Sequence, residues 1–496
     1  MNNNKPSHPF KPVRSVLAIA LALSLAACAD FSGVKPSEAA ARDASSLGLQ
    51  ATTEAQPAIA ADWWRAFGDA QLDRLVSQSL EGSPNLRLAQ ARLTRARAAS
   101  EIADSALRPQ LGGQVDITHQ RFTENGLYPK PLAGSIDDTA TAQLAGSWEI
   151  DFFGKNRAAL NAAVGNERAA EADAQAARLL LASQVVRNYL QLGRLNDQLT
   201  VAERTLAQRT ETLKLVRDRV DAGLDTRLEL RQSEGGLPEA RQQIEALREQ
   251  MTLTRNALAA LAAQPQIARD ITAPSLTVIK AQTLPGTVPA DLLGRRADIM
   301  AARWRVEAAG QDVRNAKAQF YPNVNLTAFA GFSSIGLDNL LKAGSLQWGI
   351  GPALRLPIFE GGKLRGNLRG KNADLDAAVE SYNGAVIDAV REVADQLASI
   401  QSLVIQQREQ AAAQEAAEGA YDIAVQRYRA GLGNYLNVLT AESSVLTQRR
   451  QQVDLAARAL DVQTQLARAL GGGYAPDAAP PTAAAALPES HAQLSR

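Results

Sequence analysis

The sequence holds very few of the residues from which catalytic and metal sites are built. It has a single cysteine, Cys28, and three histidines, His8, His119 and His491, in 496 residues. One cysteine forms neither an intramolecular disulfide nor a metal-binding cysteine cluster. The isolated histidines provide no catalytic triad. Neither an enzyme nor a resident metal or cofactor is therefore expected.

Aromatic residues, charge of one sign and long apolar runs are scarce as well. Aromatics make up 5% of the chain, and 53 basic residues face 52 acidic ones. Such a balance gives no electrostatic reason to bind nucleic acid. Beyond residue 27, no stretch has the 18 or so uninterrupted apolar residues of a membrane helix. The composition favours long helices over a compact enzyme core.

The N-terminus has the layout of a secretory signal peptide. Basic residues precede an apolar run that ends in Leu25-Ala26-Ala27-Cys28. This site resembles the lipobox of bacterial lipoproteins, which implies cleavage before Cys28, acylation of that residue and, because Ala29 follows, sorting to the outer membrane. The alternative is an ordinary signal peptide with an incidental cysteine. We assign residues 1–27 to the leader and residues 28–61 to a lipidated, extended tether.

The rest of the chain has the pattern of one unit built twice. An alanine- and arginine-rich helical segment runs through a proline into a strand at residues 84–115 and again at 289–332. Placing Pro109 on Pro322 aligns Arg92 with Arg305. We expect a first repeat over residues 62–263, a linker over 264–288, a second repeat over 289–470 and a disordered tail over 471–496.

Each repeat is predicted to contain one long helix. The stretch from Lys155 to Ala222 has no proline, and apolar residues recur in it every seven positions, as in a coiled-coil seam. Its roughly 67 residues would form a rod of about 100 Å. The stretch Lys363–Arg429 is equally free of proline. The shorter helical segments of each repeat sum to a similar length, which predicts two short helices stacked end to end beside one long helix.

One of these shorter segments, residues 226–263, contains Gly235, Gly236 and Pro238. A proline inside a helix costs about 3 kcal/mol and usually marks a kink or a break. We therefore expect this helix to be interrupted.

Alternating apolar residues predict four strands with the length of membrane-crossing strands. They cover about residues 110–120, 141–151, 323–332 and 347–357. Aromatic residues lie near their ends, as at membrane interfaces, namely Trp148, Phe152, Phe153, Phe320, Tyr321 and Phe359. Four strands do not close a barrel, whereas three chains would supply twelve. The alternative is a soluble hairpin covered by helices, with these aromatics in a core.

Five motifs at these spacings resemble the TolC-like outer-membrane efflux lipoproteins of the NodT subgroup. They are Trp63-Trp64, Leu293-Gly294-Arg295-Arg296-Ala297-Asp298-Ile299, Tyr321-Pro322, Pro357-Ile358-Phe359-Glu360-Gly361-Gly362 and Arg427-Tyr428-Arg429-Ala430-Gly431. Where Ala297 stands, the family usually has proline. The resemblance implies a mainly α fold with a small β part: a homotrimer whose duplicated repeats form an α-helical periplasmic barrel and a twelve-stranded transmembrane β-barrel.

The same resemblance implies a function. The protein would be the outer-membrane channel of a tripartite efflux system, a passive duct that carries small toxic compounds or drugs from a periplasmic adaptor and an inner-membrane pump of the RND type. The alternative is a lipid-anchored coiled-coil protein with a structural or adhesive role. A fibre of that kind would not need four strands duplicated together with their helices.

The two tips of the helical hairpins are repeats of each other, because Ala222–Thr226 aligns with Ala430–Asn434. A glycine after a long helix supplies a left-handed cap. By the resemblance, the tips dock the adaptor through Gly223, Leu224, Asp225, Thr226, Gly431, Leu432, Gly433 and Asn434. The candidate aperture residues are Tyr428, Asn437, Thr440 and Glu229. Family members often carry acids where Asn437 and Thr440 stand, and neither residue is charged.

Overall fold

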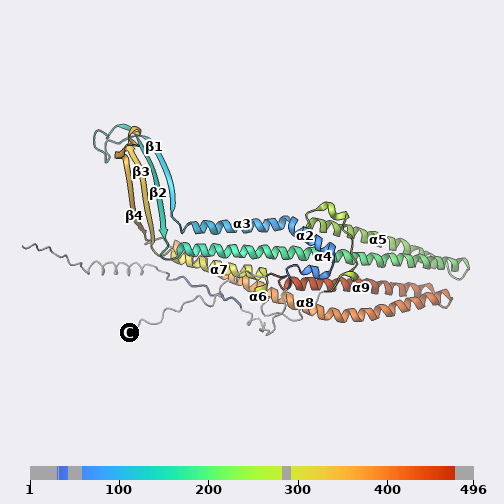
Figure 1. Ribbon diagram of the computed structural model, residues 1–496. Helices are drawn as coiled ribbons and strands as arrows, with labels where there is room; N and C mark the ends of the chain where they lie inside the picture. The colour runs from blue at the N-terminus through green and yellow to red at the C-terminus, as the bar shows by residue number, and fades with distance from the viewer. Residues whose placement is uncertain (1–30, 32, 43–58, 282–291, 475–496) are drawn as a thin grey trace, which may run out of the picture.

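The computed structural model describes residues 31, 33–42, 59–281 and 292–474. The predicted leader, the predicted lipidation site Cys28 and residues 475–496 of the predicted tail lie outside the described residues. A four-stranded sheet stands at an angle to one end of a long body of helices, and two helical tips form the other end (Figure 1). The mainly helical fold with four strands per chain is confirmed.

The two halves of the chain have matching element orders. After the short helices η2 (Trp63–Phe67) and α2 (Ala70–Gly82), the first half continues with α3 (Pro84–Ser105), β1 (Gln110–Arg121), β2 (Ile136–Ile150), α4 (Lys155–Asp221) and α5 (Arg227–Leu261). Two short turns follow, η3 (Pro265–Arg269) and η4 (Leu276–Val278). The second half contains α6 (Leu292–Arg295), α7 (Ala297–Ala318), β3 (Asn323–Ile335), the turns η5 (Leu337–Asn339) and η6 (Ala343–Ser345), β4 (Leu346–Arg355), α8 (Lys363–Arg429) and α9 (Tyr435–Ala469).

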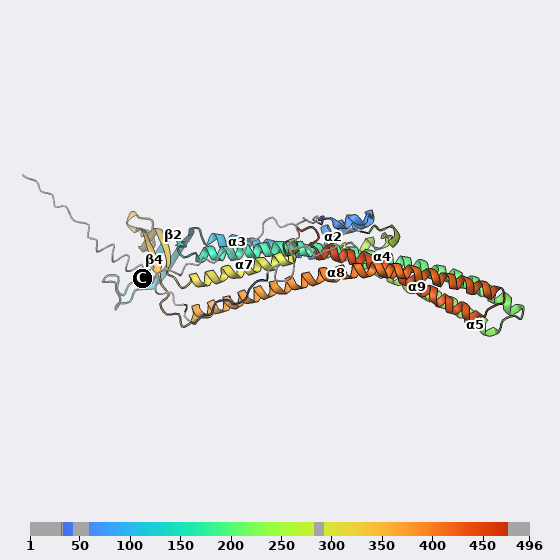
Figure 2. The same ribbon diagram turned by 90° about the horizontal axis from the view of Figure 1, so that it is seen from below.

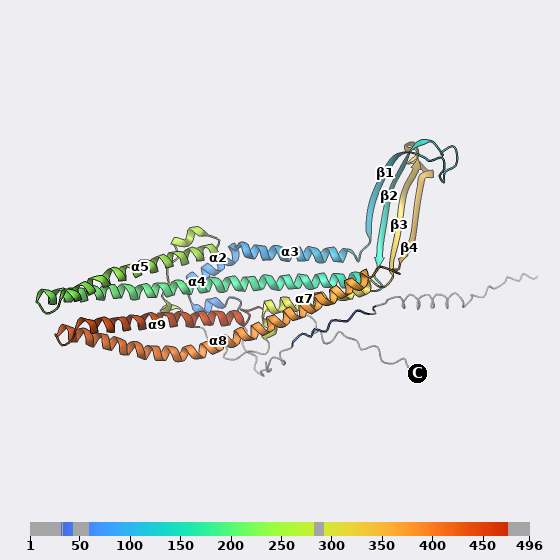
Figure 3. The same ribbon diagram turned by 180° about the vertical axis from the view of Figure 1, so that it is seen from behind.

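The long helices α4 and α8 each have 67 residues. Helices α3 and α5 follow one another along α4, and α7 and α9 follow one another along α8, so the expected stacking of short helices is observed (Figures 1 and 3). Helix α4 also packs against α7 and α9, which joins the two halves into one body (Figure 2). Among the described residues, none of the helices combines the length and hydropathy of a membrane span.

The expected break in the helix after the first tip, α5, is wrong. The helix runs without interruption through Gly235, Gly236 and Pro238. Leu237 and Ala240 beside the proline are buried, and α5 packs along α4. The free energy gained by burying this face offsets the cost of the helical hydrogen bond that Pro238 cannot donate.

The strands form one antiparallel sheet in the order β1-β2-β3-β4. Strand β2 begins at Ile136, five residues before the expected start, because residues 136–140 pair with the end of β1. Strand β3 continues to Ile335 for the same reason, since it pairs with the start of β2. Large apolar side chains on one face are exposed in this chain, namely Leu111, Val115, Ile117, Leu144, Trp348 and Ile350.

The main core lies in the middle of the helical body. Trp63, Trp64 and Phe67 of η2 pack there against α4 residues that include Val185 and Leu192. Residues of the predicted linker join this core, since Ile271 and Leu276 are buried.

The prediction of a disordered tail over residues 471–496 is wrong for residues 471–474. The chain continues beyond α9 through Gly471, Gly472 and Gly473, which all have positive φ angles, to Tyr474. A Cβ on Gly472 would meet Leu179, and one on Gly473 would meet Ala61. Only glycine fits at these positions, because the turn is packed so tightly that no side chain has space there.

Candidate functional site

The two tips lie at the end of the helical body farthest from the sheet (Figure 1). Helix α4 turns into α5 at Gly223, where φ is 72°, and α8 turns into α9 at Gly431, where φ is 73°. The amide of Leu224 donates to the carbonyl of Arg219 at 2.9 Å, and the amide of Leu432 donates to Arg427 at 2.8 Å. Both tips therefore have the expected left-handed glycine caps.

The helices that leave the tips are capped by polar side chains. Thr226 begins α5 in a capping box with Glu229, whose carboxylate accepts from the Thr226 amide at 3.0 Å. The hydrogen bond from the Thr226 hydroxyl lowers the pKa of Glu229. At the other tip, the amide of Asn437 donates to the Asn434 side chain at 3.1 Å. Glu229, a predicted aperture residue, thus belongs to a helix cap.

A partly buried polar cluster joins the two tips. The guanidinium of Arg219 donates to both carboxylate oxygens of Asp225, at 2.9 and 3.3 Å, and to the carbonyl of Tyr428 at 3.0 Å. It also lies 4.6 Å from the centroid of the Tyr428 ring. The Tyr428 hydroxyl donates to Asp225. We call Arg219, Asp225 and Tyr428 the tip lock, because it connects the end of α4 with the end of α8.

Electrostatics keep the tip lock in one protonation state near neutral pH. The hydrogen bond from Arg219 lowers the pKa of Asp225, and the bond from Tyr428 acts in the same direction. Burial, followed by the hydrogen bond to Asp225, raises the pKa of Tyr428. Asp225 is therefore a charged acceptor and Tyr428 a neutral donor, and hydrogen bonds that include a charged partner are about twice as strong as neutral ones.

Both tips also expose leucines to solvent. Leu224 and Leu432 are 65% and 69% exposed, and Leu228 and Leu436, one turn further along, are 63% and 62% exposed. The two pairs are related by the internal repeat. Each tip thus presents two apolar side chains on a polar surface.

The structure separates the predicted aperture residues into three groups. Tyr428 is fully buried in the tip lock, while Glu229 caps α5. Asn437 and Thr440 are exposed near the start of α9, where the Thr440 hydroxyl donates to the Leu436 carbonyl at 2.9 Å. Tyr428 contacts the predicted residue Asp225 of the other tip, whereas Glu229 and Asn437 bond within their own tips, to Thr226 and Asn434.

Arg219 was not predicted, although the repeat offers a clue. It aligns with Arg427, a residue of one of the family motifs. The two arginines act differently, since Arg427 donates only to its own tip, at the Leu432 carbonyl, at 3.3 Å. Gly433 stands where the first tip has Asp225, so the second tip contributes a tyrosine but no acid.

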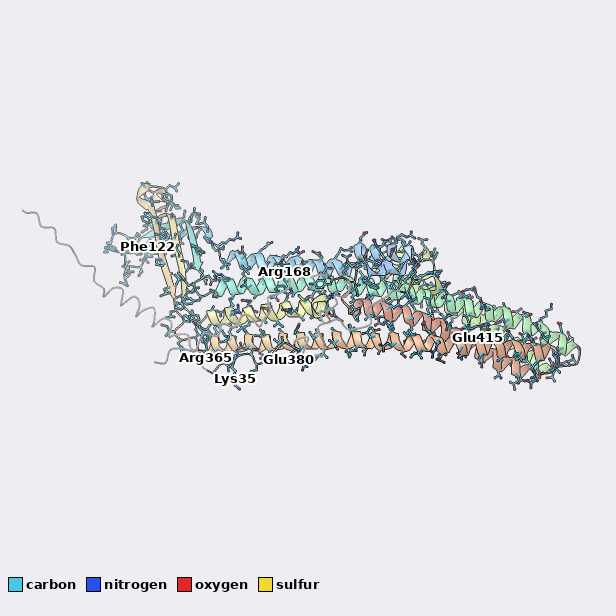
Figure 4. All side chains as sticks on the ribbon, turned by 60° about the horizontal axis from the view of Figure 1, so that its bottom comes forward. Lys35, Phe122, Arg168, Arg365, Glu380 and Glu415 are labelled. Atoms are coloured by element: carbon cyan, nitrogen blue, oxygen red, sulfur yellow. The ribbon has the colours of Figure 1, made fainter. Side chains whose placement is uncertain are left out.

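A second candidate site lies at the sheet end of the helical body, where residues 33–42 run along α8. Figure 4 shows Lys35 beside α8, between the labelled Arg365 and Glu380. The side-chain amide of Asn372 donates to the Lys35 carbonyl at 2.7 Å. Asn383 donates to the Ala40 carbonyl at 3.1 Å and accepts from the Arg42 amide at 2.8 Å. We call residues 31 and 33–42 the strap, because the buried side chains of Asn372 and Asn383 hold its backbone.

The strap begins at the foot of the sheet. The ring of Phe31 lies 4.8 Å from that of Phe320 and 6.3 Å from that of Tyr321, directly before β3. Tyr321 stacks on Phe153 from the other strand-to-helix connection, with 4.7 Å between the ring centroids. The described part of the predicted tether, residues 31 and 33–42, is bound to the helical body.

Comparison with known proteins agrees with this architecture. The family model for the outer membrane efflux protein matches residues 75–264 and 288–472, once in each half of the chain. Fusaric acid resistance protein FusA of Burkholderia cepacia is 38% identical over 73% of this chain and 70% of its own length. Multidrug resistance outer membrane protein MdtP of Escherichia coli K12 is 32% identical over 84% of this chain and 86% of its own length.

Solved structures give the same result. The outer membrane protein VceC of Vibrio cholerae superposes with a TM-score of 0.80 at 38% identity, covering 84% of this chain and 99% of that one. The outer-membrane channel OprN gives a TM-score of 0.80 at 27% identity, over 90% and 99% of the two chains. The interpretation as an adhesive coiled-coil protein is therefore set aside. The predicted family is confirmed: the chain belongs to the outer membrane efflux protein family.

Proposed function

We propose that three copies of the chain form a passive efflux duct through the outer membrane. The observation that carries this function is the separation of two ends: a sheet with an exposed apolar face and, about 100 Å of helix away, a pair of tips tied by the tip lock. Three chains would close their sheets into one twelve-stranded wall and align their long helices as a tube below it. An energised pump would drive transport, since the duct has no chemistry of its own.

The relatives suggest the class of cargo. FusA is named for resistance to fusaric acid, and MdtP and MdtQ for multidrug resistance. We infer that this chain, too, exports small toxic organic compounds. The pump and a periplasmic adaptor would select the compound before it reaches the duct, with an RND-type pump expected from the family resemblance.

The strap supports a lipid anchor at Cys28. Phe31 packs at the foot of the sheet, and Cys28 precedes it by three residues, which span at most about 11 Å of extended chain. An acyl chain on Cys28 would therefore enter the membrane beside the sheet. This position agrees with an outer-membrane lipoprotein that extends into the periplasm.

The tips would bind the adaptor, and the tip lock would hold the duct closed at rest. Exposed leucines beside the glycine turns suit an apolar contact with a helical hairpin. Opening the lower mouth would separate α4 and α5 from α8 and α9, which breaks the contacts of Asp225 with Tyr428. Tyr428 would thus act by holding two hairpins together, whereas Asn437 and Thr440 would line the passage.

Assembly and conduction test the proposed duct. Protein extracted in detergent is expected to crosslink as a trimer and to form narrow, mostly closed channels in planar bilayers. A Cys28→Ser variant that is monomeric and soluble without detergent would contradict the proposal.

Export tests the role of the tips. Leu432→Asp places a charge on the apolar tip and is expected to abolish export while trimers remain intact. Leu341→Asp is the matched control, because Leu341 is 81% exposed at the opposite end of the molecule. Normal export by the Leu432→Asp variant would remove the docking role.

A further inference from the structure

The sheet has a polar face opposite the apolar one. Register places Gln114 beside Gln143, Ser147 beside Thr327, and Asn325 beside Ala353 on this face. The Gln347 side chain donates across the face to Gln143 at 3.4 Å. Because the apolar face suits lipid, the polar face is the one that would line a water-filled passage.

One aromatic residue interrupts the polar face. Phe329 of β3 pairs with Ala145 on one side and Gly349 on the other, so its ring shares their face. The other aromatic residues of the four strands, His119, Trp148, Phe332 and Trp348, lie on the opposite face by the same register. Phe329 is thus the single aromatic side chain on the polar face of the strands.

The Phe329 ring lies over Gly349. A Cβ on Gly349 would come within 2.7 Å of ring carbon Cε1, and within 2.9 Å of Cζ. The ring needs the glycine, because any larger residue would displace it. Covering a glycine in a neighbouring strand is also a known way to stabilise a sheet.

The rest of the ring stays open to solvent. Phe329 is 41% exposed, and its lateral partners Ala145 and Gly349 are too small to rise above it. Gly331, two residues further along β3, adds no side chain to the same face. Exposed aromatic surface on a wetted wall is unfavourable unless something contacts it, and a π face binds aromatic rings and lipophilic cations.

We propose that Phe329 is a contact site for aromatic and lipophilic cargo on the passage side of the sheet. This inference rests on the proposed trimeric duct, in which threefold symmetry places three Phe329 rings at one height. The rings offer weak, repeated contacts in an otherwise polar wall, so that apolar compounds leave without binding tightly. Phe329 is a specificity-determining residue for cargo, whereas the tip lock controls only opening.

Block of ion current by tetraphenylphosphonium tests the site. Channels are recorded in planar bilayers in an Asp225→Asn background, so that the tips do not limit the current, and the cation is added on the sheet side. We expect Phe329→Ala to raise the half-blocking concentration about three- to tenfold, in line with a contact of about 1 kcal/mol. Phe332→Ala is the matched control, three residues away on the apolar face, and should leave block unchanged.

The outcomes are distinguishable. Equal block in Phe329→Ala and its parent overturns the contact site while the duct stands. Absence of channels in the parent protein overturns the proposed function itself. If Phe329→Ala does not assemble, Phe329→Leu decides, because leucine still covers Gly349 but removes the π face. Weaker block in Phe329→Leu supports the proposal, and unchanged block overturns it.

Discussion

The hydroxyl of Tyr428 donates a hydrogen bond to Asp225, which lies 203 positions earlier in the chain. The two residues come from different helical hairpins, and Arg219 binds both of them. The bond is largely shielded from solvent, since Tyr428 is fully enclosed and Asp225 is 12% exposed. A contact of this kind connects the hairpins at the point where they must part if the duct is to open.

Tyr428→Phe is expected to increase the open fraction of the channel. The change removes one hydrogen bond to a charged acceptor, which contributes about 1.5–3 kcal/mol, while the ring still fills its site. A loss of 1.4 kcal/mol corresponds to a tenfold change in the equilibrium between closed and open states. Single-channel recording would measure the open probability. Arg429→Gln is the control, because the Arg429–Glu211 pair joins the same hairpins but is 52% and 72% exposed and contributes about 0–1 kcal/mol. Equal effects of the two changes would argue against the tip lock.

The tip lock is also expected to weaken at both extremes of pH. The hydrogen bond from Arg219 lowers the pKa of Asp225. The Asp225 carboxylate therefore stabilises the tip lock fully above the ordinary aspartate pKa of about 3.9. This stabilisation is lost as pH falls through the lowered pKa. Burial raises the pKa of Tyr428, so its contribution is complete below about 10 and is lost as pH rises through the raised pKa. Open probability should therefore be flat from about pH 5 to 9.

Two variants separate these limbs of the pH profile. Asp225→Asn should remove the acid limb and Tyr428→Phe the alkaline limb, with trimers checked by crosslinking at each pH. If open probability still changes at low pH in Asp225→Asn, a group other than Asp225 is responsible for that change.

Repetition made most of the fold predictable. The proline-free heptads of α4 and the alternating residues of β3 are local patterns that recur along the chain, and each element follows from its own sequence. The continuity of α5 could not be predicted in this way. The burial of Leu237 and Ala240 is a tertiary effect, and it overrides the local cost of Pro238.

The site was less predictable than the fold. Glycine caps can be recognised from spacing, so Gly223 and Gly431 were found. The partnership of Arg219 with Asp225 and Tyr428 depends on two hairpins meeting about 200 positions apart, and no periodic pattern reports such a pair. Asp225 was therefore predicted only as a docking residue of the tip, whereas the structure commits it to an ion pair with Arg219.

Asn383→Ala is expected to release the strap from α8. Asn383 is 5% exposed and satisfies both the Ala40 carbonyl and the Arg42 amide, and loss of such a partner costs about 1–3 kcal/mol. Hydrogen exchange at the Arg42 amide should accelerate about tenfold or more. Asn367→Ala is the control on the same helix, because Asn367 is exposed and its side-chain amide donates to Gln319 at 3.3 Å. Unchanged exchange in Asn383→Ala would show that the other contacts of the strap, including the bond from Asn372 to the Lys35 carbonyl, hold it without Asn383.

Gly471→Ala is expected to destabilise the protein strongly. Gly471 has a φ of 96°, and a Cβ there would lie 1.8 Å from the Arg295 carbonyl oxygen, so both the backbone conformation and the space exclude alanine. We expect a loss of about 3 kcal/mol or more in the free energy of unfolding, measured as a lower midpoint in thermal or denaturant unfolding of the detergent-solubilised protein. Gly366→Ala is the matched control in α8, where a Cβ would meet nothing within 4 Å and helix propensity favours alanine by about 1 kcal/mol. The two Gly→Ala changes should therefore shift the midpoint in opposite directions, and a shift in the same direction would mean that the turn after α9 is not held in the packed conformation.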